Sequence, residues 1–345
     1  MIQTRPWLLP LSWPYAAAVW LRNKLYAKGI IRSVAPSGKT VVIGNLSLGG
    51  TGKTPHTDYV VGLLGAERCA LLSRGYGRTS SGFVKITPDA HPDAVGDEAL
   101  LIVRRNPALA AAVCEDRTEG LERLAAHFPE REVTVLDDAL QHRRVRGGLN
   151  ILLTTWHRPF TRDYCLPAGS LRDHKVRARD ADCVVVTKTP KDAGEEARNR
   201  LRKELEYLNV PVFFSHTLPG RTEPLTAPAA VPITALKHVL LISAVAEPEI
   251  FEAEARSDLP VEAHFAYRDH YRFKRADLKR IRKFIGKFAP GSAGVVTTEK
   301  DAVRLLPFSA EFQKDLIPVF YREIDVDFGK DARNFNELIL NYAES

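Results

Sequence analysis

The sequence has few cysteines and no long apolar run. Its four cysteines, at positions 69, 114, 165 and 183, form neither a Cys-x-x-Cys pair nor a Cys/His cluster with metal-ligand spacing. This pattern is typical of reduced, buried thiols in a cytosolic protein rather than of a disulfide framework. An uncharged segment at residues 7–21 is interrupted by Pro10 and Pro14 and is shorter than the roughly 20 apolar residues of a spanning helix. No secretory signal, internal repeat or low-complexity tract is evident.

The excess of charge is modest and positive. Lys and Arg number 49 against 42 Asp and Glu, which gives a net charge of +7 and a pI of about 9.2. This balance favours an anionic partner, which can be a phosphate compound, a nucleic acid or an acidic membrane surface. The chain contains no recognisable nucleic-acid-binding module, so we expect no nucleic-acid partner. Its 345 residues are enough for two domains with substantial cores.

A glycine-rich loop is the most informative feature of the chain. It reads Gly49-Gly50-Thr51-Gly52-Lys53-Thr54, between a β-branched run at 40–43 and a helical pattern at 55–64. This order is typical of nucleotide-phosphate binding, because backbone N–H groups and a helix N-terminus surround the phosphate oxygens. We expect Lys53 to reach the β- and γ-phosphates and the Thr54 hydroxyl to bind Mg²⁺. The full pattern has glycine where this chain has Ser47.

Strands alternating with helices predict a parallel sheet flanked by helices. The strands are expected at 40–43, 69–73, 133–136, 150–155, 183–187 and 210–215, with helices at 55–64, 96–105 and 118–128. The predicted fold is therefore α/β, a P-loop NTPase-like sheet with a second, smaller α/β domain. Four prolines within 219–232 indicate a boundary. We expect a P-loop domain at 31–225 and the smaller domain at 226–345, with strands at 239–244 and 294–298 and a basic helix at 276–288.

Residues 1–30 form a separate N-terminal segment in this prediction. Trp7, Trp13 and Trp20 lie in it, and Arg22, Lys24 and Lys28 follow or flank the last of them. Tryptophan prefers the headgroup region, and basic side chains bind anionic lipid there. We interpret the segment as an interfacial, monotopic membrane anchor on the cytoplasmic side. The alternative is an N-terminal helix packed on the core of its own domain.

Several polar residues are candidates for the chemistry. Either Asp137 or Asp138, at the end of an apolar strand, can hold Mg²⁺. Asp97, at an expected helix start, is either an N-cap or the base that a kinase needs. Asp269-His270 is either structural or able to adjust the pKa of a base. Arginines bind phosphate with two prongs, and an anionic acceptor accounts best for the set at 74, 78, 117, 143, 144 and 172.

Taken together, seven runs resemble the tetraacyldisaccharide 4′-kinase family, the lipid A 4′-kinases of Gram-negative bacteria. They are residues 44–55 (GNLSLGGTGKTP), 72–78 (LSRGYGR), 96–98 (GDE), 136–144 (LDDALQHRR), 166–172 (LPAGSLR), 269–270 (DH) and 298–301 (TEKD), in the order of that family. The family's loop also lacks the first glycine, so Ser47 fits it. Ala99, Ala139-Leu140 and Ser170 depart from its usual pattern and remove no chemical group.

The resemblance implies that ATP, with Mg²⁺, phosphorylates the 4′-hydroxyl of a tetraacyldisaccharide 1-phosphate at the bacterial inner membrane. It implies two α/β/α domains joined by a hinge, and a monomer is expected. Asp97 would be the general base, assisted by His270 across a domain cleft, with Lys53 acting on the phosphates. The implied substrate-binding residues are Asn45, Arg74, Tyr76, Arg117, Gln141, His142, Arg143 and Arg172. A partitioning-type ATPase is the rival interpretation, but Leu48 stands where those proteins have lysine.

Overall fold

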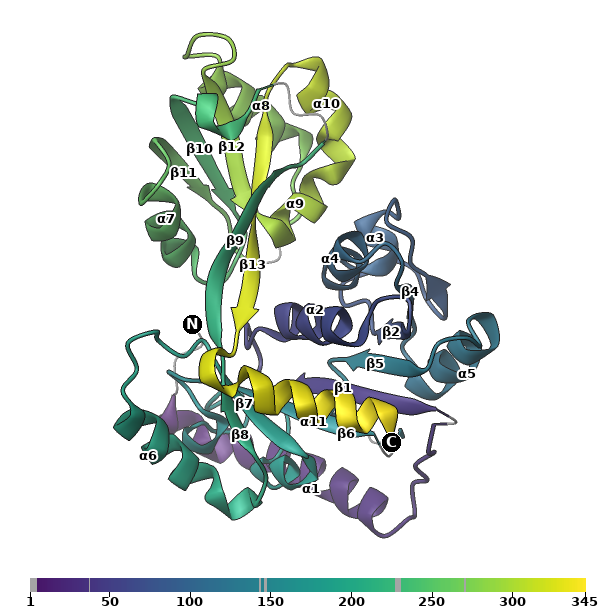
Figure 1. Ribbon diagram of the computed structural model, residues 1–345. Coiled ribbons are helices and arrows are strands. Elements are labelled where there is room, and N and C mark those ends of the chain that lie inside the picture. Colours follow the sequence, from purple (N-terminus) through teal and green to yellow (C-terminus); the bar gives the residue numbers. More distant parts are fainter. Residues whose placement is uncertain (1–4, 37, 143, 146–147, 227–230, 270) are drawn as a thin grey trace. The chain divides into compact units, whose positions relative to one another are not determined.

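The structure is a computed structural model that describes residues 5–36, 38–142, 144–145, 148–226, 231–269 and 271–345. It divides into two compact units (Figure 1). The larger unit contains the chain up to residue 217 together with 326–345, and the smaller unit contains 218–325. Each unit is built on its own sheet.

Eight described strands form the sheet of the large unit, in the order β3-β4-β2-β5-β1-β6-β7-β8. Neighbouring strands are parallel except β3 and β4. β1 lies between β5 and β6, where the chain changes the side on which it adds strands, and ligands bind at such a switch point. The strands are β1 (Lys39–Asn45), β2 (Cys69–Ser73), β3 (Val84–Lys85), β4 (Ala110–Val113), β5 (Val133–Asp137), β6 (Leu149–Thr155), β7 (Cys183–Thr187) and β8 (Val212–Phe214).

Helices cover both faces of this sheet. On one face, Val42 of β1 packs in a cluster with Leu124 of α5, and strands β6–β8 pack against α6 through Leu201 and Leu205. On the other face, α2 contacts β1 and β5, and α4 and α11 pack against α2 (Figure 1). The helices are α1 (Leu9–Ala27), α2 (Lys53–Leu64), α3 (Pro92–Val95), α4 (Asp97–Arg105), α5 (Arg117–His127), α6 (Glu195–Leu205) and α11 (Ala332–Glu344). The predicted three-layer α/β fold is confirmed.

The small unit is a second α/β/α layer structure. Its five described strands are ordered β11-β10-β12-β13-β9. Side chains alternate along β10: Leu240 and Ile242 pack with Leu278 of α8, whereas Val239 and Leu241 pack with Phe251 of α7. The elements are β9 (His216–Pro224), β10 (His238–Ser243), α7 (Pro248–Arg256), β11 (Val261–Ala266), α8 (Arg275–Ile285), β12 (Ala293–Thr298), α9 (Glu299–Leu305), α10 (Ser309–Lys314) and β13 (Val319–Asp327).

The predicted domain limits are wrong at both ends of the small unit. β9 runs into the proline-rich segment at 219–232, and its place at the edge of the sheet tolerates proline because an edge strand need not donate from every N–H group. The C-terminal segment returns to the large unit, where the ring of Phe328 lies 5.0 Å and that of Phe335 6.1 Å from the ring of Tyr59 in α2. The apolar side of α11 is evident in the sequence, but the surface that buries it is not.

Helix α1 packs on the large unit, which is one of the two alternatives that the sequence left open. It is fixed to the large unit by polar contacts: Tyr15 donates to the carbonyl of Arg172 at 2.9 Å, and Asn23 donates to the buried Asp173 at 2.9 Å. Trp13 and Trp20 of α1 are 70% and 51% exposed, and Trp7, in the turn before α1, is 74% exposed. None of the helices in the described part of the chain is long and apolar enough to cross a membrane.

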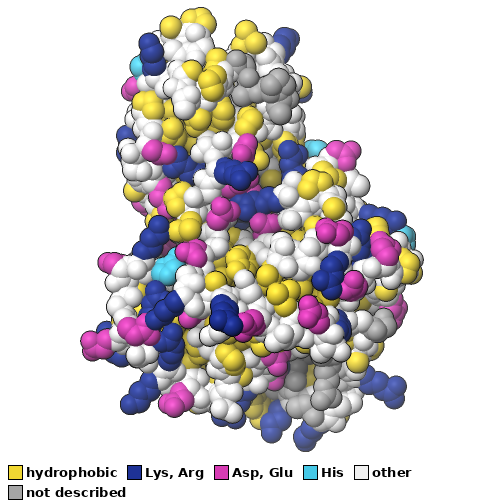
Figure 2. Space-filling model, in the orientation of Figure 1, with side chains coloured by type: hydrophobic (Ala, Val, Ile, Leu, Met, Phe, Trp, Pro, Cys, Tyr) yellow, Lys and Arg dark blue, Asp and Glu magenta, His cyan; other side chains and the backbone are white. Residues whose placement is uncertain are grey.

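Charges of both signs are mixed on the face of the molecule that Figure 2 shows. On the face shown in Figure 2, Lys and Arg side chains lie among Asp and Glu side chains, so the positive excess is not concentrated on that face.

All four cysteines are free, and Cys69, Cys114 and Cys183 are buried whereas Cys165 is half-buried. Burial raises the pKa of the Cys69 thiol to about 12, which keeps it protonated.

Candidate nucleotide-binding and catalytic site

The glycine-rich loop connects the end of β1 to the start of α2, as the sequence predicts. Gly49 and Gly52 have φ angles of 100° and 82°, a region that favours glycine. Ser47 instead forms an isolated β-bridge with Leu171, which is extended backbone that needs no glycine. Gly52 is the N-cap of α2 and Lys53 is its first residue. The first N–H groups of a helix have no intrahelical partner, so the loop presents donors and a cation at one place.

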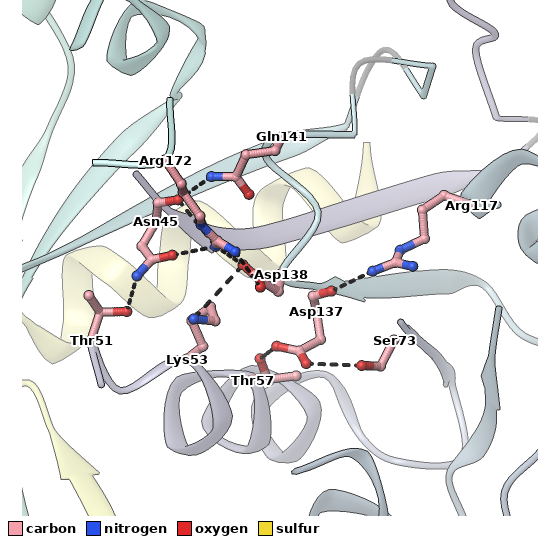
Figure 3. A network of polar contacts seen from close by, with 10 residues as sticks. All are labelled: Asn45, Thr51, Lys53, Thr57, Ser73, Arg117, Asp137, Asp138, Gln141 and Arg172. Carbon is pink, nitrogen blue, oxygen red and sulfur yellow. Dashed lines mark hydrogen bonds and ion pairs between the residues drawn. The ribbon is translucent and has the colours of Figure 1, made fainter. Parts of the chain in front are cut away.

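A polar network joins the loop to the carboxyl ends of the neighbouring strands (Figure 3). Asn45, the last residue of β1, donates to the Thr51 hydroxyl at 2.7 Å and accepts a bond of 2.6 Å from Arg172. Its carbonyl accepts from the Gln141 side chain. The three predicted substrate-binding residues in this network, Asn45, Gln141 and Arg172, are therefore brought together and hold the loop.

The paired aspartates lie in different environments. Asp137 ends β5 and is 2% exposed; the hydroxyls of Thr57 and Ser73 donate to its two oxygens at 3.3 and 3.2 Å (Figure 3). Burial, with the charges of Glu98 and Asp138, raises the pKa of Asp137 to about 6. Asp137 is therefore a desolvated carboxylate in an acidic surrounding that a bound cation would stabilise.

Asp138 faces the cations instead. It has a φ of 50°, a strained conformation for a residue other than glycine, and accepts from both terminal nitrogens of Arg172, with a distance of 2.9 Å from Nη1 to Oδ2. The Nζ of Lys53 lies 3.9 Å from Oδ1. Burial raises the pKa of Asp138, but the bond from Arg172 and the charge of Lys53 outweigh it and keep that pKa below its usual value.

Arg117 is buried and His142 is half-buried, and the two residues contact each other. Arg117, the first residue of α5, is 2% exposed and donates to the carbonyls of Cys114 and Asp137 at 2.7 and 3.4 Å. The Nε2 of His142 accepts from the N–H group of Arg117 at 3.3 Å. Burial, with the charge of Arg117, lowers the pKa of His142 to about 4, so the ring is neutral at pH 7. In this structure both residues support the backbone behind Asp137.

Asp97 is the first residue of α4 rather than its cap. The N-cap is Gly96, with a φ of 87°, and the Asp97 carboxylate accepts from the N–H group of Glu98 at 3.0 Å. Gly96 lies against the loop after β2, since a Cβ atom there would be 3.0 Å from the Cα of Gly75. The charge of Glu98 acts on Asp137, so the start of α4 lies within electrostatic range of the paired aspartates.

The remaining predicted residues divide into two groups. Arg74 and Tyr76 are exposed in the loop after β2, where a large ligand has access to them. Arg143 and His270 lie outside the described residues. No group of three or more His, Cys, Asp or Glu side chains within the described ranges is arranged to hold a metal ion.

Sequence reasoning missed the groups that hold the site from behind. Thr57 lies one helical turn after Lys53, and Ser73 is the last residue of β2; both positions point to the site once the sheet order is known. His56 was also missed: it is buried and bonds the carbonyl of Gly52 at 2.7 Å and the hydroxyl of Ser215 at 2.8 Å. It lies next to Pro55 in the quoted motif, but nothing in the motif indicates its partners.

An ammonium group at the start of a helix, facing a carboxylate at the end of the neighbouring strand, is suited to binding and polarising the phosphates of a nucleotide. The fold and this arrangement define a P-loop nucleotide-binding protein.

Comparison with known proteins identifies the family. The family model described as LpxK, tetraacyldisaccharide-1-P 4′-kinase, matches residues 4–344. Tetraacyldisaccharide 4′-kinase of Phocaeicola vulgatus is 39% identical, covering 99% of this chain and 96% of its own. The enzyme of Flavobacterium psychrophilum is 35% identical, with 99% and 97% covered. A crystal structure of LpxK from Aquifex aeolicus in complex with ATP matches with a TM-score of 0.76 and 25% identity, covering 98% of this chain and 99% of that one. The chain belongs to the tetraacyldisaccharide 4′-kinase family and is a kinase.

Proposed function

We propose that this kinase transfers the γ-phosphoryl group of ATP to the 4′-hydroxyl of a tetraacyldisaccharide 1-phosphate lipid, a step of lipid A biosynthesis. The observation that carries the proposal is Lys53 at the start of α2, with its Nζ 3.9 Å from Asp138, in a chain whose family match extends over residues 4–344. The related LpxK crystallised with ATP supports the choice of nucleotide.

The loop and its surroundings would bind the phosphates of ATP. Backbone N–H groups of the loop would donate to the phosphate oxygens, and the Lys53 ammonium would neutralise part of the phosphate charge. The donor set fits Mg²⁺, which prefers oxygen ligands: the Thr54 hydroxyl and the carboxylates of Asp137 and Asp138. Both oxygens of Asp138 already accept from Arg172, whereas those of Asp137 accept from neutral hydroxyls. We therefore assign Asp137 to the metal. When bound, the ion would stabilise the negative charge of the phosphoryl group that is transferred.

Asp97 would remove the proton from the lipid hydroxyl. It is a half-buried residue at the start of α4, next to Glu98, whose charge acts on Asp137. As the hydroxyl oxygen bonds to the γ-phosphorus and the bond to ADP breaks, Asp97 takes the proton. His270, which the family resemblance implies as an assistant of the base, is proposed in that role. Exposed Arg74 and Tyr76 would bind the anionic, carbohydrate part of the lipid.

The lipid substrate requires a membrane, and helix α1 offers a surface for it. Three tryptophans on α1 and the preceding turn are at least half exposed, and the polar contacts of Tyr15 and Asn23 hold the helix to the large unit. Indole rings favour the headgroup region. We propose peripheral binding at the cytoplasmic face of the bacterial inner membrane, through this side of α1.

The test is transfer of label from γ-labelled ATP to the lipid in detergent micelles with Mg²⁺. The native chain should label the lipid. Asp97→Asn should reduce turnover at least a hundredfold with nearly unchanged ATP affinity, whereas Asp93→Asn in α3 serves as a matched control with normal turnover. Free phosphate without labelled lipid would indicate an ATPase and refute the proposal. Loss of ATP affinity in Asp97→Asn would refute the assignment of the base alone.

A further inference from the structure

A second lysine lies at the glycine-rich loop, and it comes from another strand. Lys188 directly follows β7, whose carboxyl end lies at the same edge of the parallel sheet as the loop. Its Nζ lies 3.9 Å from the position that a Gly50 Cβ atom would occupy. Its side chain is half-buried. A cation is therefore placed over the middle of the loop, away from Lys53 at the loop's end.

The backbone of Lys188 adopts a conformation that lysine disfavours. Its φ is 54°, and Asp138 at the end of β5, with a φ of 50°, shows the same feature. Left-handed conformations of residues other than glycine persist where the surrounding structure holds them, and they gather at functional sites. Here Thr187 and Thr189, on either side, are both buried, so the neighbours of Lys188 hold its direction.

Direct contacts couple the Lys188 segment to the loop. The Thr187 hydroxyl donates to the carbonyl of Thr51 at 2.9 Å. The N–H group of Thr189 donates to the carbonyl of Ser215 at 3.0 Å, and the Ser215 hydroxyl bonds His56, which also bonds the carbonyl of Gly52. The residues on either side of Lys188 and the loop thus belong to one hydrogen-bonded assembly, which fixes the backbone from which the Lys188 side chain extends.

The charges at the loop leave a role for a second cation. The carboxylate of Asp138 lies 3.9 Å from Lys53 and accepts from Arg172, so the positive charges of both are shared with an acid. A nucleoside triphosphate carries several negative charges along its phosphate chain. One ammonium shared with an aspartate neutralises only part of them.

We propose that Lys188 is a nucleotide-binding residue that contacts the phosphate chain of ATP and ADP at the Gly50 side of the loop. The inference rests on the proposed function only in taking the ligand to be a nucleoside di- or triphosphate. The segment after β7 would therefore contact the nucleotide directly, in addition to the loop and the paired aspartates.

The test measures the affinity for ATP and ADP with Mg²⁺ by calorimetry, at low and raised salt. Lys188→Asn removes the charge and tolerates a positive φ, Lys188→Gly accepts the same backbone without a side chain, and Lys188→Arg keeps the charge. Lys191→Asn, at an exposed lysine of the same loop, is the matched control. We expect Lys188→Asn and Lys188→Gly to bind ATP and ADP about tenfold more weakly, from one lost charge-assisted bond.

Two further readouts separate phosphate binding from a structural role. The affinity of Lys188→Asn should depend less on salt than that of the native chain, and Lys188→Arg should recover most of it. Native affinity in Lys188→Asn or Lys188→Gly would overturn the proposal, as would a loss that keeps the native salt dependence and is not recovered by arginine. Failure of the native chain to bind ATP would instead refute the proposed function.

Discussion

The pair formed by Arg172 and Asp138 allows a quantitative prediction. Arg172 donates to both carboxylate oxygens, and the two side chains keep 22% and 29% of their surface exposed. Charge-assisted bonds contribute about 1.5–3 kcal/mol each, and exposure places this pair at the lower end. Since Lys53 stays within 3.9 Å of Asp138, part of the charge remains compensated after Arg172 is removed. We expect Arg172→Met to lower the free energy of unfolding of the large unit by about 2 kcal/mol.

A double-mutant cycle isolates the pair. Arg172→Met with Asp138→Asn should lose less than the sum of the two single variants, with a coupling of about 1–2 kcal/mol, since the second change removes the unpaired charge. The free energies come from urea unfolding followed by tryptophan fluorescence. Arg162 and Glu204 form a similar two-pronged pair with Arg162 61% exposed, and their cycle should give under about 1 kcal/mol. Additivity within about 0.5 kcal/mol for Arg172 and Asp138 would refute the reasoning.

Three further predictions concern other parts of the chain. Without metal or nucleotide, burial keeps the pKa of Asp137 at about 6, so the folded chain holds a proton that the unfolded chain releases near pH 4. The free energy of unfolding of Asp137→Asn should therefore rise by about 2–3 kcal/mol relative to that of the native chain as the pH rises from 4 to 7. A difference in melting temperature that stays constant over this range would contradict the prediction. Gly96→Ala should cost about 1–3 kcal/mol because of its φ of 87° and the close Gly75 backbone, whereas Gly62→Ala in α2, with open space, should cost nothing; equal melting temperatures would exclude the strain. Trp13→Ser should weaken binding to anionic vesicles about tenfold in sedimentation, and undiminished binding would exclude α1 as the contact.

The local pattern around the loop was predictable from the sequence. The order of a β-branched run, a glycine-rich loop with Gly-Lys-Thr and a helical pattern predicts a phosphate-binding loop between a strand and a helix. The structure has this loop, with Lys53 at the start of α2. The strands expected at 69–73, 133–136 and 183–187 coincide with β2, β5 and β7, because burial against a sheet leaves a regular signature along the chain. The short strand β4, the strands β11 and β13 and the helix α6 were not predicted.

What depends on packing between distant segments was not predictable. The sequence shows Asp137 and Asp138 as equivalent, but Thr57 and Ser73 select one and Arg172 the other. The sequence does not show that Arg117 is buried and donates to the carbonyl of Asp137. The return of α11 to α2 depends on which surface can cover its apolar side, and no local pattern encodes that choice.

The most direct test of the account is the position of the phosphate on the product. The lipid formed from tetraacyldisaccharide 1-phosphate and ATP would be purified and analysed by ³¹P NMR. The account predicts two phosphate monoesters, the original one and a new one at the 4′-oxygen, in a quantity equal to the ADP released. A diphosphate at the 1-position, or ADP released without a second monoester on the lipid, would contradict it.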